Sequence, residues 1–185
     1  ALFTMIDSVG ADVSSVMWTV PNVVTQSAMI SVTSTDLVGL TDADTTATFT
    51  ILDGIFPELE LSELGANYSI PEFHVLSSEW TASDNIGLDS AFVYYSTDAG
   101  DNYSYMGGDD AESGVFTFEI PQGMTDQAII MVEVRDNAGN VSADSSALFT
   151  VTDYTPPSIE ISSPVAGEHF DIDGFMTTDW SASDN

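Results

Sequence analysis

The 185-residue sequence contains no cysteine, no lysine and a single arginine, Arg135. Without cysteine, neither a disulfide framework nor thiol chemistry is available. Contact with phosphates requires cationic side chains, so the near absence of Lys and Arg argues against nucleic acid as a partner. It also argues against binding to an anionic membrane surface. No apolar run approaches the ~20 residues of a membrane span, and the first residues do not resemble a signal peptide.

Acidic residues are abundant instead: thirty Asp and Glu give a formal net charge of −29. They are scattered among apolar residues that make up 43% of the chain, so the composition indicates a folded core and not a disordered acidic tail. Three interpretations of this acidity remain open. The acidic residues could adapt the protein to high salt, keep a long surface protein soluble, or supply carboxylates that bind calcium, and these roles can coexist.

The sequence repeats itself with a period of 100 residues and no gap. The segment Trp80-Thr81-Ala82-Ser83-Asp84-Asn85 recurs as Trp180-Ser181-Ala182-Ser183-Asp184-Asn185, and Phe49-Thr50-Ile51-Leu52-Asp53 recurs as Phe149-Thr150-Val151-Thr152-Asp153. A fixed period without insertions is typical of a structural unit duplicated in tandem. The period divides the chain into the C-terminal half of one unit (1–54), a complete unit (55–153) and the N-terminal part of the next (154–185).

Alternating apolar residues predict that the complete unit consists of seven short strands. Turn signals separate these strands about every 8 to 12 residues, which is typical of an antiparallel all-β sandwich of the immunoglobulin-like type. The partial units fit the same alternation: Val16, Trp18 and Val20 match Phe116, Phe118 and Ile120. The predicted core consists of Trp80, Val93, Phe116, Phe118, Val132, Val134 and Phe149.

Four segments of the complete unit resemble the immunoglobulin-like repeats of large bacterial and archaeal secreted or cell-surface proteins. They are Trp80-Thr-Ala-Ser-Asp-Asn-Ile-Gly87, Tyr94-Tyr-Ser-Thr-Asp-Ala-Gly100, Phe118-Glu-Ile-Pro121 and Val134-Arg-Asp-Asn-Ala-Gly-Asn140. The resemblance implies an extracellular or cell-surface location and a role in a stalk, a fibre or an adhesive array. Similar modules also accompany secreted hydrolases, so an accessory or carbohydrate-binding module is the alternative.

Strand order in such a sandwich predicts a metal site at one end of the complete unit, where the incoming linker arrives. Carboxylates and amides from the linker and two loops meet there, and Ca²⁺ accepts six to eight oxygen ligands from such groups. The alternative is that Asp, Asn and Gly are simply the residues that such turns prefer. The candidate ligands for Ca²⁺ here, and at the joint one period later, are Asp53, Asp84, Asn85, Asp89, Asp136, Asn137, Asn140, Asp153, Asp184 and Asn185. The first partial unit has Asp36-Leu37-Val38-Gly39-Leu40 and lacks both Asn residues of the corresponding loop.

Catalysis is not expected. His74 aligns with Gly174 and His169 with Ser69, so neither histidine belongs to the repeated pattern, and no Ser-His-Asp arrangement or His-rich metal spacing is evident. The expected partners are therefore neighbouring repeats, copies of the chain itself, or a cell-surface or glycan ligand. The two partial units are halves of one fold, so copies of this chain are expected to complement each other head to tail into a filament. Alternatively, the sequence is a stretch of a longer chain in which the missing strands are covalently present.

Overall fold

Alternation of buried and exposed residues builds the longest strands of the computed structural model, which describes residues 3–184. In β11 (Thr125–Asp136) the side chains of Ala128, Ile130, Val132 and Val134 are buried. The same alternation occurs in β7 (Val75–Ser83) and β8 (Leu88–Ser96). Side chains on a strand point alternately to its two faces, so each of these strands places one apolar face on the core.

The chain is all-β apart from one turn of 3₁₀-helix, η1 (Ala111–Ser113). The remaining strands are β1 (Thr25–Ala28), β2 (Ser31–Thr35), β3 (Thr41–Thr45), β4 (Phe49–Ile51), β5 (Glu58–Leu61), β6 (Ser69–Pro71), β9 (Ser104–Asp110), β10 (Val115–Glu119), β12 (Val141–Ser145), β13 (Phe149–Thr152), β14 (Ser158–Ser163) and β15 (Asp179–Ser183). No helix in the described part of the chain is long and apolar enough to cross a membrane.

Two sheets enclose the core between residues 58 and 152, in an arrangement consistent with a β-sandwich. One has the strand order β10-β7-β5; the other has the order β6-β13-β11-β8-β9, with β12 also paired to β11. Tyr95 on β8 lies 6.1 Å from the ring of Phe118 on β10 and 6.3 Å from the ring of Phe149 on β13. These aromatic rings therefore join the two sheets across the core.

Most of the predicted core is confirmed. Trp80, Val93, Phe118, Val132, Val134 and Phe149 are all buried, and the Trp80 indole donates a 3.0 Å hydrogen bond to the carbonyl of Ala111. Phe116 differs, because it is only partly buried at the margin of the cluster. Its ring occupies the space that a Cβ at Gly107 would need, and the Gly107 φ of +145° is in any case a conformation that residues with a side chain rarely adopt.

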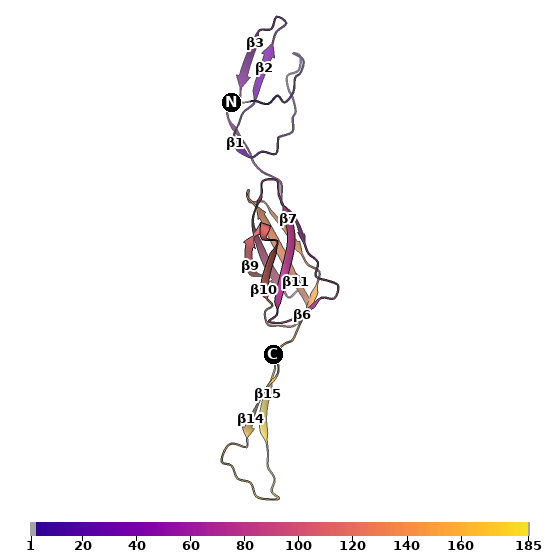
Figure 1. Ribbon diagram of the computed structural model, residues 1–185, viewed down its shortest axis with the longest axis vertical. Coiled ribbons are helices and arrows are strands. Elements are labelled where there is room, and N and C mark those ends of the chain that lie inside the picture. Colours follow the sequence, from indigo (N-terminus) through magenta and orange to yellow (C-terminus); the bar gives the residue numbers. More distant parts are fainter. Residues whose placement is uncertain (1–2, 185) are drawn as a thin grey trace.

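Outside this central part, short paired strands lie along the long axis of an extended molecule (Figure 1). Strand β1 pairs with β4 and β2 with β3 toward the N-terminus, while β14 pairs with β15 toward the C-terminus. Their registers match the central ones after a shift of 100 residues. Thr25 faces Ile51 as Thr125 faces Val151, and Ile161 faces Trp180 as Leu61 faces Trp80.

Three strand expectations are wrong. The part of the chain between residues 58 and 152 has nine strands, β5 to β13, and not seven. Strand β6 pairs with β13 in parallel, whereas only antiparallel pairs were expected. Residues Val16, Trp18 and Val20 form no strand, although their counterparts lie on or next to β10. Strand β10 is held by antiparallel pairing with β7. No strand of the described residues pairs with 16–20, and a strand without a partner leaves its backbone hydrogen-bonding groups unpaired.

Candidate metal centre

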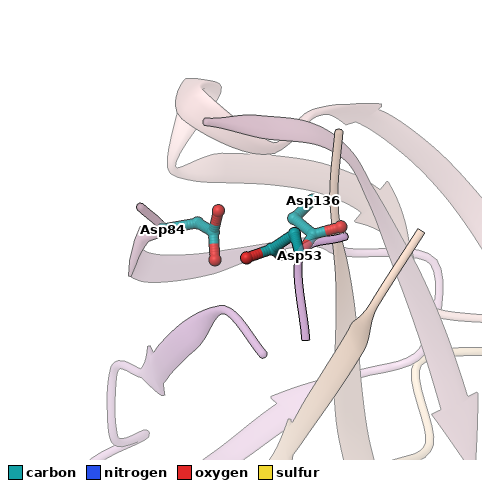
Figure 2. Close-up of side chains that lie close together, drawn as sticks. All are labelled: Asp53, Asp84 and Asp136. Atoms are coloured by element: carbon teal, nitrogen blue, oxygen red, sulfur yellow. The ribbon is translucent and has the colours of Figure 1, made fainter. Parts of the chain in front are cut away.

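Three carboxylates converge where the linker after β4 meets the central sheets. One oxygen from each of Asp53, Asp84 and Asp136 lies within 4.8 Å of the others (Figure 2). Asp53 lies on the linker, Asp84 follows β7, and Asp136 ends β11. At this separation each pair of charges repels by about 1 kcal/mol in water, and by several times more at the lower effective dielectric of a partly buried site.

Asp136 and Asp84 are each positioned by hydrogen bonds within their own loop. Asp136 Oδ1 accepts 2.8 Å hydrogen bonds from the backbone N–H groups of Ala138 and Asn140, an arrangement typical of a tight Asx turn. Asp84 Oδ2 accepts one from the N–H of Ile86 at 2.8 Å. These loops are held together because Asn137 donates hydrogen bonds from its backbone N–H to the Gly87 carbonyl and from its side chain to the Ile86 carbonyl.

Asp136 is buried, with 2% of its surface exposed. Burial alone would raise its pKa, but hydrogen bonds from the side chain and N–H of Asn140 and from the N–H of Ala138 outweigh burial and hold the pKa below its ordinary value. The site therefore contains a buried carboxylate that stays ionised at neutral pH. A buried negative charge beside two other carboxylates favours a cation.

The Asn140 side chain reveals an excess of acceptor atoms. Its Nδ2 lies 2.9 Å from Asp53 Oδ2, 2.8 Å from Asp136 Oδ2 and 3.0 Å from the carbonyl oxygen of Ile55. An amide NH₂ group carries two hydrogens, so it cannot donate fully to three oxygens. Three acceptor oxygens therefore surround the Asn140 amide nitrogen, and exchange of the amide oxygen and nitrogen by rotation would place an additional oxygen beside them, as a bound cation would require.

Asp84 provides a second and independent observation that favours a cation at this position. Its Oδ1 is inaccessible to solvent and has no hydrogen-bond partner among the residues that the structure describes. A buried carboxylate oxygen without a donor costs free energy, and a bound cation would remove that cost.

A side chain that the sequence did not single out reaches the candidate site from the preceding part of the chain. Asn22 Oδ1 accepts a 2.7 Å hydrogen bond from Asn85 Nδ2, which also donates to Asp53 Oδ1 at 2.9 Å. Asn85, in the loop between β7 and β8, thereby contacts both the linker and the part of the chain before it. The counterpart of Asn22 one period later is Gln122, so no recurring residue marked this position.

Other predicted ligands lie elsewhere. Asp89 is on the exposed face of β8, where it accepts a hydrogen bond from Ser90, and Asn137 faces the backbone of the neighbouring loop. Asp153 accepts a 2.8 Å hydrogen bond from the N–H of Thr155, and neither Asp153 nor Asp184 belongs to a carboxylate group like the first among the described residues. The position 100 residues after Asp136 is outside this sequence. Asn185 lies outside the described residues.

Comparisons with known proteins leave the site to be interpreted from its geometry. Neither a scan against models of protein families nor a search of curated proteins gave a significant match to the chain.

Proposed function

We propose that this chain belongs to an extracellular array of tandem immunoglobulin-like repeats that serves as a structural or adhesive part of a surface stalk, fibre or filament. Strand pairing supports this proposal, because three pairs of strands recur in the same register after a shift of 100 residues. The extended arrangement of the three parts in Figure 1 is also what an array would show. Under this proposal residues 1–54, 55–153 and 154–185 belong to successive repeats, and the chain is not an enzyme.

Calcium at the incoming joint is the second part of the proposal, and the position of Asp53 carries it. Asp53 lies on the linker, yet its two carboxylate oxygens accept hydrogen bonds from Asn85 and Asn140 in two different loops of the following sheets. Carboxylates of Asp53, Asp84 and Asp136, the Ile55 carbonyl and the amide oxygens of Asn22, Asn85 and Asn140 would supply the hard oxygen ligands that Ca²⁺ prefers. An ion bound to both the linker and the loops would stiffen the joint.

Calorimetric titration and thermal unfolding test this site directly. Adding Ca²⁺ to the metal-free chain should release or absorb measurable heat and raise the melting temperature, because an ion that binds only the folded state stabilises it. Asp84→Asn keeps the shape of the side chain but removes a charge, and should weaken both responses. Asp89→Asn is the matched control, since Asp89 lies on an exposed strand face near the same end. It should leave both responses unchanged.

A lack of response would overturn the calcium proposal. If Ca²⁺ produces no heat and no change in melting temperature at moderate salt, the carboxylates serve solubility or adaptation to high salt instead. The sequence on either side of these residues in the natural protein tests the array: further copies with a period near 100 residues support it.

An aromatic group on the outer face of β8 and β9 favours a second candidate, a carbohydrate-binding module of a secreted enzyme. The Tyr105 ring lies 5.6 Å from the ring of Tyr94 and 6.3 Å from that of Phe92, and the Arg135 guanidinium lies 4.9 Å from the centre of the Phe92 ring. Exposed aromatic rings offer flat apolar surfaces with polar edges. Binding to a panel of glycans that is lost in Tyr105→Ala would support this alternative.

A further inference from the structure

A second buried carboxylate lies at the opposite end of the central sheets. Glu72, in the turn between β6 and β7, has 0% of its surface exposed. Its Oε2 accepts a 2.8 Å hydrogen bond from the N–H of Gly123, in the turn between β10 and β11. Its Oε1 accepts a 2.6 Å hydrogen bond from the Thr155 hydroxyl and a longer one, 3.5 Å, from the N–H of Tyr154. The carboxylate therefore joins the outgoing linker to two turns of the central sheets.

Further contacts hold the same part of the linker. The backbone N–H of Glu72 donates to the Thr152 carbonyl at 3.0 Å, at the end of β13. The Tyr154 ring packs edge-on against the His74 ring with 4.6 Å between centroids, and His74 Nδ1 lies 3.2 Å from the Glu72 carbonyl oxygen. Tyr154 and Thr155 are thus fixed by both their backbone and their side chains.

Two prolines make the segment after Thr155 stiff. Pro156 and Pro157 separate Thr155 from Ser158, the first residue of β14. Each proline ring restricts φ, and a residue before proline is confined to extended backbone, so this segment is a stiff spacer. The direction set at Thr155 therefore carries over to the β14–β15 hairpin.

The incoming linker has a different composition at the same positions. Gly54 stands where the outgoing linker has Tyr154, Ile55 stands for Thr155, and Phe56 stands for Pro156. A glycine at this point gives the backbone more freedom. The residue corresponding to Glu72 in the following part is Ile172, so the carboxylate is a feature of this joint and not of the repeated pattern.

We propose that Glu72 is a latch that fixes the direction of the outgoing linker, and that this joint keeps its geometry without a divalent cation. The N–H groups of Gly123 and Tyr154 and the Thr155 hydroxyl donate hydrogen bonds to the buried Glu72 carboxylate, and the Asp153 side chain also contacts it. At the incoming joint, by contrast, Asp84 Oδ1 is buried and has no hydrogen-bond partner among the described residues. The contrast between the joints rests on the proposed calcium site, but the latch does not. One chain thus contains a joint that responds to calcium and a joint that does not.

Distances between spin labels across each joint test the proposal, and the absence of native cysteine allows labels to be placed on introduced cysteines alone. Thr117→Cys with Glu160→Cys spans the outgoing joint, and Thr33→Cys with Thr117→Cys spans the incoming one; all three positions are exposed. In the otherwise native chain, the 117–160 distance distribution should be narrow and unchanged by a calcium chelator.

Glu72→Gln should broaden the 117–160 distribution at least twofold, because a glutamine cannot accept hydrogen bonds at both of its terminal atoms. Thr155→Val, which removes the hydroxyl from the linker side and keeps the side-chain shape, should broaden it too, and covers the case in which Glu72→Gln fails to fold. Glu79→Gln, an exposed glutamate on β7, is the control and should leave it narrow.

A broad 117–160 distribution in the otherwise native chain, or a narrow one in folded Glu72→Gln or Thr155→Val, would overturn the latch. The 33–117 pair tests the calcium site independently of the latch. If the chelator broadens the 33–117 distance distribution, calcium at the incoming joint is supported. If the 33–117 distribution is unchanged, calcium at that joint is contradicted, whatever the 117–160 distribution shows.

Discussion

Asn140 donates a hydrogen bond to Asp53 over 2.9 Å, although 87 positions separate the two residues. Asp53 lies on the linker before the central sheets, and Asn140 lies in the loop between β11 and β12, so this pair closes the incoming joint. Leu40 occupies the position 100 residues before Asn140. A leucine side chain cannot donate the hydrogen bond that Asn140 donates to the linker. The joints along the chain therefore differ in their contacts.

Asn140→Ala should reduce the calcium-induced rise in melting temperature by at least half. The substitution removes the side chain whose Nδ2 contacts Asp53, Asp136 and the Ile55 carbonyl together, and with it the amide oxygen that we propose as a ligand. Asn102→Ala is the control. Asn102 hydrogen-bonds Asp98 in a turn away from the joint, so its loss should lower the melting temperature without altering the response to calcium. Equal calcium responses in the two variants would exclude Asn140 as a ligand.

Phe118→Ala should lower the free energy of unfolding by about 3–5 kcal/mol, as is typical of removing a large aromatic side chain from a core. Phe118 is 7% exposed and packs against Tyr95 from the opposite sheet. Met124→Ala provides the comparison: Met124 is 63% exposed, and its truncation should change stability by less than about 0.5 kcal/mol. Denaturant unfolding of both variants measures the difference, and a loss below about 1 kcal/mol for Phe118→Ala would contradict its place in the core.

The sequence predicted the core well because alternation is a local property. Side chains along β11 point alternately to its two faces, so Val132 and Val134 are buried whereas Glu133 between them is only partly buried. The pairing of β11 with its neighbouring strands fixes which face is turned to the core. Phe116 departs from the pattern because it lies at the margin of the cluster, where alternation continues but neighbouring layers no longer cover the side chain. Val16 and its neighbours depart because a strand also needs a partner strand, which a local pattern does not supply.

The carboxylate group of the candidate metal centre could be predicted only in part. Strand order placed Asp53, Asp84 and Asp136 at one end, and the structure brings these three together. Asp89 was misplaced because β8 already begins at Leu88, which turns residue 89 to the exposed face. Asn22 and the burial of Glu72 could not be predicted, since both depend on how a linker folds back onto neighbouring turns. The alternation of apolar residues and the 100-residue repeat carry no information about how a linker folds.

Acid should remove the contribution of Asp98 to stability. Hydrogen bonds from the side chain and N–H of Asn102, and from the Ser96 hydroxyl, lower its pKa to about 2. Because the folded pKa lies below the unfolded one, this contribution is complete above about pH 4 and is lost as the pH falls through about 2. Protonation of the many other carboxylates also changes self-repulsion in this acidic chain, so the informative quantity is a difference between variants.

Melting temperatures of the native chain and of Asp98→Asn therefore need to be compared from pH 7 to pH 2. The gap between the two should be largest and constant above about pH 4, and should close as the pH approaches the folded pKa of about 2. A gap that stays constant down to the lowest pH would show that the Asp98 carboxylate is not held in its charged form by the turn.

The 185-residue polypeptide should associate head to tail when prepared by itself. Ile161 and Trp180 on the β14–β15 hairpin are 64% and 62% exposed, whereas their counterparts Leu61 and Trp80 are 8% and 3% exposed in the core. Strands β1 to β4 of a second copy have the registers of β11, β12 and β13, which lie near that hairpin's counterpart in the central sheets. Burial of this apolar surface favours association, and a contact between unlike ends can propagate along a filament.

Sedimentation velocity over a range of concentrations and salt tests this association. The net charge of −29 makes copies repel each other, so added salt should strengthen the contact by screening. Trp180→Ala should weaken association at least tenfold, because it removes the largest apolar side chain of the hairpin. Phe175→Ala is the matched control: Phe175 is fully exposed, but its counterpart Val75 is exposed as well, so this position does not enter the core of the complete unit. A chain that stays monomeric at high concentration and high salt would refute the complementation, and the exposed hairpin would then require neighbouring residues of a longer chain to cover it.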